Sequence, residues 1–295
     1  MEKDSSKIVS SVTLVNAFTY ENPDGNKMLG NGAGVTYFGL DNDSFPDDSV
    51  MQEVAREVGL SETAFICKGQ GNSFNLRWFT PTKEVDMCGH ATLASAHYMY
   101  EAGVVSNDTE ISFYTRSGVL KAKKKDDLIW MDFPKEALNG CGLPVGKEEL
   151  KNILGINGTI DFFAMTMLNR DGFVVVDSEE AVRNLKPDMD ELSKVDARGF
   201  IVTAKSDSKE FDFVSRFFAP RYGIPEDPVT GSAHCALCPY WAEQLSKNTD
   251  VMTGAQLSID SKGNALGGVV KVVLDGERVK LGGMAEVTGE KEIEL

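Results

Sequence analysis

A short motif near residue 80 returns about 140 residues later, and this internal repeat constrains the fold more than any other feature of the sequence. The segment 77–81 reads RWFTP, and the segment 216–220 reads RFFAP. A stretch that begins with glycine follows each motif, GHATLASAHY at 89–98 and GSAHCALCPY at 231–240. Two matched motifs in one order, with offsets of 139 and 142 residues, indicate two copies of one structural unit.

Each copy contains the same order of predicted elements. A strand-like run carries the first motif, a short polar loop follows, and the glycine opens a helix. Hairpin-forming sequence comes next, at 111–122 in the first copy and at 269–283 in the second, where Asp275-Gly276 predicts the turn. The amphipathic stretch 47–59 predicts a further helix that stops at Gly59. A pair of similar units usually has its ligand site between the copies, so we expect the active site in such a cleft.

The two repeated helices carry all three histidines of the chain, His90, His97 and His234. Both helices are rich in Ala, Leu and Cys and almost free of charge, which is typical of helices buried within a domain. The N-terminus of such a helix has free N–H groups and the positive end of the helix dipole. A glycine at this end lets an anion approach the backbone, so the sequence predicts binding of a carboxylate.

Acidic residues lie near these helix starts. Asp86 precedes the first helix and Asp227 the second, and either acid could serve catalysis or simply cap its helix. His90 lies in the first turn, where the dipole and burial should lower its pKa and favour the neutral ring. From the residues alone, Glu62 could be a functional acid or a surface acid.

Metal and cofactor chemistry are less well supported. Cys235 and Cys238 form a C-x-x-C pair that could join a histidine at zinc, but buried cysteines in an apolar helix usually serve packing. The glycine run 30–34 lacks the G-x-G-x-x-G pattern of a dinucleotide loop. We therefore expect neither a metal nor a cofactor.

Composition excludes several classes of partner. A chain of 295 residues is long enough for two domains. Its net charge of −15 and pI of about 4.7 argue against a groove that binds nucleic acid. No run of eighteen apolar residues could cross a membrane, and the first residues do not resemble a signal peptide. Five scattered cysteines without a disulfide spacing suit a reducing compartment, so we expect a cytoplasmic protein.

Five motifs extend across nearly the whole chain and together resemble the PhzF-like family, which is named for the phenazine-biosynthesis isomerase. They are GNGAGV (30–35), LSETAF (60–65), RWFTP with DMCGHATLASAH (77–97), FFAP with EDPVTGSAH (217–234), and a closing GG-x-A (282–285).

The resemblance implies an α+β fold of the diaminopimelate epimerase type. Two pseudo-symmetric domains would each have a curled, mostly antiparallel, barrel-like sheet around a central helix. We expect the N-terminal half at 1–130, with the strand 280–295 returning to it, and the C-terminal half at 131–279. The resemblance also implies a homodimer and a role in a biosynthetic process.

The same resemblance implies a cofactor-independent isomerase that moves a proton on a small cyclic or unsaturated carboxylate. Glu62, whose pKa burial should raise, would be the acid/base, and His90 and Asp227 would also be catalytic. The predicted substrate-binding residues are Ser61, Cys88, Gly89, Gly231 and Ser232.

Two other functions remain open at this point. An amino-acid epimerase or racemase would use Cys88 together with Asp227, because the place before the second repeated helix that corresponds to Cys88 holds Asp227 rather than a second cysteine. A non-catalytic protein-binding or regulatory module could also retain the fold, since fold alone does not determine function.

Overall fold

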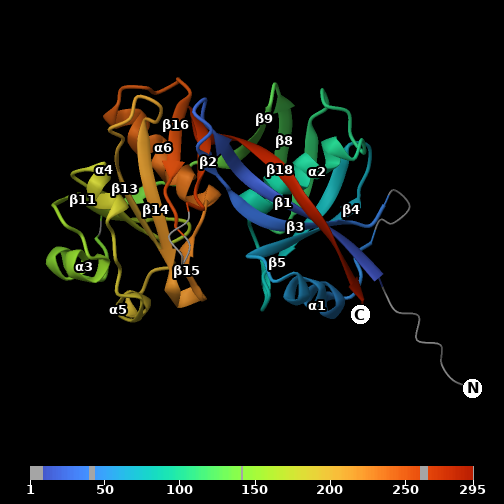
Figure 1. Ribbon diagram of the computed structural model, residues 1–295, viewed down its shortest axis with the longest axis horizontal. Helices are drawn as coiled ribbons and strands as arrows, with labels where there is room; N and C mark the ends of the chain where they lie inside the picture. The colour runs from blue at the N-terminus through green and yellow to red at the C-terminus, as the bar shows by residue number, and fades with distance from the viewer. Residues whose placement is uncertain (1–8, 40–43, 141, 260–264, 295) are drawn as a thin grey trace, which may run out of the picture. The chain divides into compact units, whose positions relative to one another are not determined.

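The computed structural model describes residues 9–39, 44–140, 142–259 and 265–294. The chain divides into two compact units, which we describe separately (Figure 1). Unit 1 contains residues 1–17, 32–131 and 283–295, and unit 2 contains residues 18–31 and 132–282.

Unit 1 is a closed barrel around one helix. Strand hydrogen bonding runs in a ring through β1, β3, β4, β5, β7, β8, β9 and β18, and then returns to β1. Helix α2 (Gly89–Glu101) lies inside this ring, and nine of its residues are buried. The bounds of the strands are β1 Val9–Glu21, β3 Asn31–Tyr37, β4 Glu62–Lys68, β5 Ser73–Phe79, β7 Ile111–Thr115, β8 Gly118–Lys125, β9 Leu128–Pro134 and β18 Arg278–Glu294; the short strands β2 (Lys27–Met28) and β6 (Glu84–Val85) and helix α1 (Asp48–Val58) complete the first half of the chain.

Unit 2 curls a second sheet around helix α6 (Gly231–Gln244), which is buried along most of its length. Its ladder runs from β10 through β11, β12, β13, β14, β16 and β17 to the start of β18. The bounds are β10 Leu138–Asn139, β11 Ile160–Thr166, β12 Gly172–Val176, β13 Phe200–Lys205, β14 Phe213–Ala219, β15 Ile224–Asp227, β16 Met252–Gln256 and β17 Gly268–Asp275, with helices α3 Lys147–Leu154, α4 Glu179–Arg183 and α5 Met189–Lys194 and a 3-10 turn at Pro220–Tyr222.

The two units repeat one topology. In unit 1 the pairs β3–β4, β4–β5, β5–β7 and β7–β8 are parallel, antiparallel, parallel and antiparallel in turn. In unit 2 the pairs β12–β13, β13–β14, β14–β16 and β16–β17 follow the same alternation. Both central helices lie at the same place in this order, before β7 and before β16. The predicted α+β fold of two similar units with curled sheets around a central helix is therefore confirmed.

The arginine of each repeated motif has the same structural role. Arg77 donates from Nε and Nη2 to the two carboxylate oxygens of Glu84, each at 2.7 Å. Arg216 makes the same two-pronged contact with Glu226, at 2.8 and 2.7 Å. Such paired hydrogen bonds fix both position and orientation. Each arginine thus holds the short strand that leads into the central helix.

A proline within α6 creates a contact that the repeat does not have in α2. Pro239 has no N–H, so the carbonyl of Cys235 lacks its helical donor. The backbone N–H of Glu136 donates to this carbonyl at 3.1 Å. The segment between β9 and β10 is thereby fixed to the helix.

No helix among the described residues is long and apolar enough to cross a membrane.

Candidate active site

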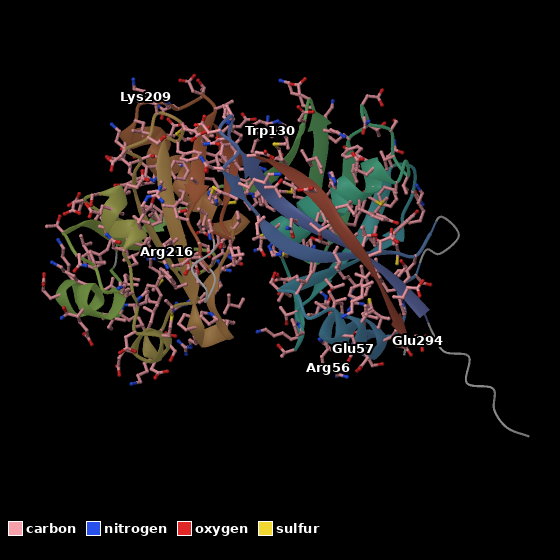
Figure 2. All side chains as sticks on the ribbon, in the orientation of Figure 1. Arg56, Glu57, Trp130, Lys209, Arg216 and Glu294 are labelled. Atoms are coloured by element: carbon pink, nitrogen blue, oxygen red, sulfur yellow. The ribbon has the colours of Figure 1, made fainter. Side chains whose placement is uncertain are left out.

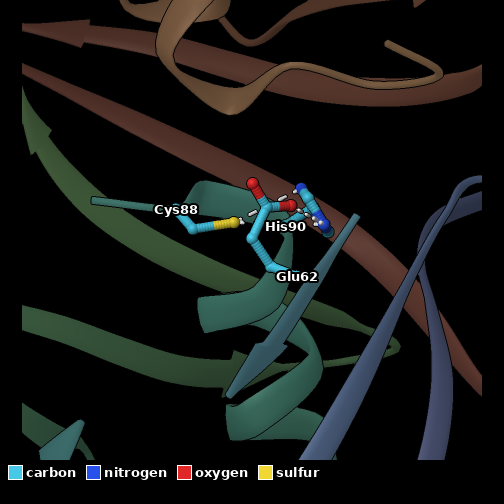
Figure 3. Close-up of side chains that lie close together, drawn as sticks. All are labelled: Glu62, Cys88 and His90. Carbon is cyan, nitrogen blue, oxygen red and sulfur yellow. Dashed lines mark hydrogen bonds and ion pairs between the residues drawn. The ribbon is translucent and has the colours of Figure 1, made fainter. Parts of the chain in front are cut away.

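Three of the predicted site residues, Glu62, Cys88 and His90, meet at the N-terminus of α2 in unit 1 (Figure 3). Glu62 is the first residue of β4, and Cys88 is the N-cap of α2. The distance from Glu62 Oε2 to His90 Nε2 is 3.2 Å, and the distance from Cys88 Sγ to His90 Nδ1 is 3.5 Å. Ser61 Oγ lies 3.2 Å from His90 Nε2 and donates to the carbonyl of Gly32.

The charges of Glu62 and His90 correct two expectations from the sequence. Burial by itself would raise the pKa of Glu62, but contacts with His90, Ser61 and Cys88 outweigh it and lower that pKa. Burial would likewise lower the pKa of His90, but contacts with Cys88 and Glu62 raise it well above its ordinary value. Because the two groups form a buried pair, each favours the charged form of the other. The resting site therefore contains a carboxylate and an imidazolium.

Cys88 is a buried thiol rather than a thiolate. Burial and the nearby charge of Glu62 raise its pKa to about 11, although His90 opposes this shift. The side chain makes no cap hydrogen bond to α2. At neutral pH the group is therefore a neutral S–H beside the Glu62 carboxylate.

Among the described residues, one group of side chains has the composition and spacing to hold a metal ion. One donor atom from each of Glu62, Cys88 and His90 lies within 4.8 Å of the others. The C-x-x-C pair of α6 has no such histidine partner in the described part of the chain. Cys235 and Cys238 are free buried thiols, and His234 Nδ1 contacts the carbonyl of Thr230 at 2.9 Å.

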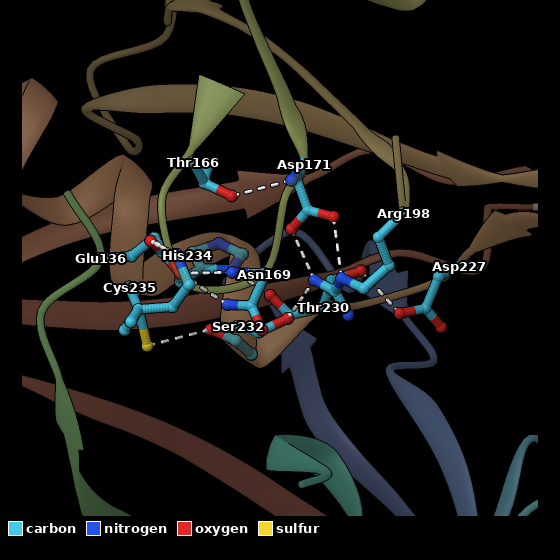
Figure 4. A network of polar contacts seen from close by, with 12 residues as sticks. Glu136, Thr166, Asn169, Asp171, Arg198, Asp227, Thr230, Ser232, His234 and Cys235 are labelled. Carbon is cyan, nitrogen blue, oxygen red and sulfur yellow. Dashed lines mark hydrogen bonds and ion pairs between the residues drawn. The ribbon is translucent and has the colours of Figure 1, made fainter. Parts of the chain in front are cut away.

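Gly89, also a predicted site residue, is the first residue of α2 in unit 1, whereas Asp227, Gly231 and Ser232 lie in unit 2, at the N-terminus of α6 (Figure 4). Asp227 Oδ2 accepts from Thr230 Oγ1 at 2.6 Å, and its Oδ1 accepts from Asn31 Nδ2 at 2.8 Å. Gln256 Nε2 donates to the backbone carbonyl of Asp227, and Gln256 Oε1 accepts from the Thr230 N–H. The N-caps of the two central helices are Cys88 and Thr230, so Asp227 is fixed by side chains rather than serving as the N-cap. Asp86 is likewise not the N-cap of α2.

Ser232, in the first turn of α6, contacts an ion pair whose acid, Asp171, is buried. Arg198 Nη2 donates to Ser232 Oγ at 3.0 Å. The same guanidinium donates from Nε and Nη2 to the two oxygens of Asp171, at 2.8 and 2.5 Å. Burial raises the pKa of Asp171, and Arg198 opposes the shift. Figure 4 shows Arg198 between Asp171 and the start of α6.

Strand registers identify which residues of the two units are equivalent. Thr63 pairs with Phe79 in unit 1, and Phe200 pairs with Phe218 in unit 2. Because Phe79 and Phe218 hold the same place in the repeated motif, Thr63 corresponds to Phe200. The N-caps and registers then give four equivalent pairs: Ser61 with Arg198, Glu62 with Gly199, Cys88 with Thr230, and His90 with Ser232.

The equivalent positions differ in chemistry. Unit 1 has a carboxylate, a thiol and an imidazole where unit 2 has a glycine and two hydroxyls. A side chain at Gly199 would overlap the ring of Phe217, so this position has no room for an acid. The three titratable side chains around the helix N-terminus thus occur in unit 1, and the equivalent positions of unit 2 hold a glycine and two hydroxyl groups.

Sequence reasoning missed Arg198, Asp171, Thr230, Asn31 and Gln256. Asn31 and Thr230 lie inside motifs that were recognised, but Asn31 contacts Asp227 from a distant strand, and the contact of Thr230 with Asp227, three residues before it, is not apparent from the motif. Arg198 and Asp171 lie outside the repeated motifs. The one available signal for Arg198 is its equivalence with Ser61, and this requires the strand register.

An open pocket of about 1010 Å³ lies elsewhere in unit 2. Its walls include Phe162 of β11 and Tyr240 and Trp241 of α6. None of the predicted site residues lines it. The pocket is therefore separate from both clusters described above.

Comparisons with known proteins agree with this fold. The sequence model of the phenazine biosynthesis-like protein family, PhzC-PhzF, matches residues 15–290. An uncharacterized isomerase from Halalkalibacterium halodurans is 43% identical over 254 residues, which cover 84% of this chain and 88% of that protein.

Two solved structures have folds similar to that of this chain. A PhzF-family phenazine biosynthesis protein from Enterococcus faecalis is 36% identical, with a TM-score of 0.82 over 98% of this chain and 100% of the other. A predicted epimerase from Pseudomonas aeruginosa shares the fold at 19% identity, with a TM-score of 0.71 over 96% of this chain and 99% of the other.

Proposed function

Because the chain belongs to the phenazine biosynthesis-like protein family, we propose that it is a cofactor-independent isomerase that moves a proton on a small carboxylate. Relatives at 42 and 43% identity are named as isomerases. Glu62 is the proton carrier in this proposal, and a cyclic or unsaturated acid is the substrate class.

The observation that carries the proposal is the buried pair of Glu62 and His90, which has no ionisable counterpart in unit 2. A carboxylate with a lowered pKa is ionised at neutral pH and is therefore ready to accept a proton. Once protonated, the same group is a comparatively strong acid and readily returns the proton. One group can thus act first as base and then as acid.

The reaction has two proton transfers. The Glu62 carboxylate removes a proton from a substrate carbon, and the electron pair of the broken C–H bond spreads over the unsaturated system. The protonated Glu62 then delivers the proton to another carbon of the same system. The His90 imidazolium stabilises the negative charge that develops between the two steps.

Residues of both units bind and orient the substrate in this proposal. Asp227 and Ser232 contribute side chains, and the N–H groups at Gly89 and Gly231 lie at helix starts where no helical acceptor is available. Ser61 and Cys88 contact His90 and also border the site. That both units act on one substrate remains a prediction from the sequence.

Racemisation by two thiols is not supported by the residues present. A two-base racemase needs a second proton carrier to act on the opposite face of the carbon. The position equivalent to Cys88 is Thr230, whose hydroxyl donates to Asp227, and the Cys88 thiol itself has a raised pKa.

The experiment is proton NMR in D₂O with a panel of cyclic, unsaturated, amino and hydroxy acids. We expect wild type to introduce deuterium at carbon for an unsaturated acid, and Glu62→Gln to lose this activity by at least about 10²-fold. Glu62→Asp, which retains the carboxylate, should lose less. Exchange that persists in Glu62→Gln would contradict the proposal, and exchange with no acid of the panel would favour the binding module.

A further inference from the structure

We infer that Arg198 binds the carboxylate group of the substrate, an inference that rests on the function proposed above. The site comprises the Arg198 guanidinium and the Ser232 hydroxyl of unit 2, with the buried Asp171 holding the guanidinium in place. The ligand class is a small organic carboxylate.

Arg198 is held rigidly on three sides. Nε and Nη2 bind both oxygens of Asp171, whose side chain is about 1% exposed. The ring of Phe217 lies beneath the guanidinium, with its centroid 5.5 Å from Cζ. Nη2 also reaches Ser232. A guanidinium fixed in this way loses little further freedom when a ligand binds.

One edge of the guanidinium remains available. Within the described part of the chain, no residue accepts a hydrogen bond from Arg198 Nη1, while Nε and Nη2 are occupied. The side chain is about one-third exposed, so a ligand can reach it. Two N–H donors on a fixed cation are therefore free for an anion.

Ser232 adds a second donor. Its oxygen accepts from Arg198 Nη2, which leaves its own O–H hydrogen free to donate. Ser232 also lies in the first turn of α6, where the helix dipole favours a negative charge. Because Asp171 already balances one positive charge, this helix end supplies the additional attraction for an anion.

The equivalent position in unit 1 has a different role. Ser61 occupies the place of Arg198 and contacts His90, the counterpart of Ser232. The same pair of positions thus holds the partner of Glu62, His90, in unit 1 and carries the Arg198 cation in unit 2. The repeat explains how one unit could provide proton transfer while the other provides anion binding.

Binding of benzoate, with benzamide as an uncharged analogue of similar shape, tests the inference without turnover. Arginine Nε–H signals in ¹H–¹⁵N NMR spectra would be followed during titration of wild type, Arg198→Gln and Arg198→Lys. Arg221→Gln is the matched control, because Arg221 is another arginine of the same unit that pairs with an acid, Asp196. Thermal unfolding would check that each variant is folded.

We expect benzoate to shift one arginine signal of wild type, and this signal should be missing from Arg198→Lys. Arg198→Gln should bind benzoate at least tenfold more weakly, Arg198→Lys should be intermediate, and Arg221→Gln should match wild type. Benzamide should not produce the shift. Equal binding of benzoate by folded Arg198→Gln, equal binding of benzamide, or no binding of benzoate by wild type would each overturn the inference. None of these results depends on proton transfer by Glu62, so the two proposals can fail separately.

Discussion

The ion pair between Glu62 and His90 determines the charge state of the candidate site before substrate binds. Burial acting alone would favour the neutral form of both groups, which was the basis of the expectation from sequence. The contact with His90, 3.2 Å away, outweighs burial and lowers the pKa of Glu62, while contacts with Cys88 and Glu62 outweigh burial and raise the pKa of His90. The proposed base is thus already ionised, and the neighbouring cation can stabilise the charge formed on the substrate.

This pair predicts the pH dependence of activity. Glu62 must be ionised, so activity should fall as pH drops through its lowered pKa. His90 must be protonated, so activity should also fall as pH rises through its raised pKa. The pH–rate profile should therefore be a broad plateau that includes neutral pH.

A His90→Asn variant provides the comparison. It should lose about 10²–10³-fold in rate, because a group that stabilises developing charge is removed. Its acidic limb should move to higher pH, because Glu62 no longer has a cationic partner. An unchanged acidic limb would show that the pair does not control the pKa of Glu62.

The role of the Cys88 thiol distinguishes the isomerase from the racemase, because only the racemase would use this thiol to transfer a proton. Cys88→Ser retains a small hydrogen-bond donor beside His90 and should retain exchange activity within about tenfold. A thiol that transferred protons would instead cost about 10²–10⁴-fold when replaced. Cys67→Ser, a buried thiol of β4, is the matched control. Deuterium exchange rates of the two variants would decide between these roles.

Among the elements, β4 begins at Glu62 in unit 1, and Gly199 directly precedes β13 in unit 2. The absence of a side chain at Gly199 has a packing cause, because any Cβ there would overlap the ring of Phe217. Phe217 also supports the guanidinium of Arg198. The glycine thus leaves room for the ring on which the arginine rests.

Gly199→Ala should consequently destabilise the protein by about 1–3 kcal/mol, as expected for overpacking a filled site. Gly140→Ala is the control, since nothing lies within 4 Å of a Cβ added there. Chemical denaturation would give both free energies of unfolding. If the two variants had equal stability, the tight contact with Phe217 would not be the reason for the glycine.

Much of this arrangement of elements could be predicted from local sequence. The helix ending at Gly59 is present as α1, and Gly59 has the left-handed φ of 72° that favours glycine. The hairpin around Asp275-Gly276 is present as β17 and β18. Both depend on neighbours in sequence, and so a pattern in the chain can reveal them.

Contacts between distant segments could not be predicted in the same way. The pairing of Arg198 with Asp171 joins residues that no motif connects. Pro239 leaves the carbonyl of Cys235 without its helical donor, and the backbone N–H that binds this carbonyl belongs to Glu136, about 100 residues earlier in the chain. The signs of the pKa shifts at Glu62 and His90 also depend on a distance that only the folded chain supplies.

For the whole molecule, the two proposals assign different chemistry to two units of one topology. Residues 18–31 cluster with unit 2, through backbone contacts of Leu29 and Gly30 with Leu266 and Gly267. The sequence repeat does not reveal this exchange, because the segment precedes the first repeated motif. The repeat did predict the shared topology, since burial of a charge-poor helix requires a sheet around it.

The assembly state is a further prediction for the whole molecule. The family resemblance predicts a homodimer, with a mass twice the 32.2 kDa of the chain. Sedimentation equilibrium at several concentrations would measure this mass. A species that stays at the mass of one chain at every concentration would contradict the predicted dimer and leave the proposed chemistry unaffected.

The most direct test of the central claim is the stereochemistry of deuterium in the product formed in D₂O by wild type and by Glu62→Gln. A single proton carrier should place deuterium on one face of one carbon, and folded Glu62→Gln should place none. Deuterium on both faces, or labelling that continues in Glu62→Gln, would mean that another group transfers the proton, and the account built on Glu62 would be wrong.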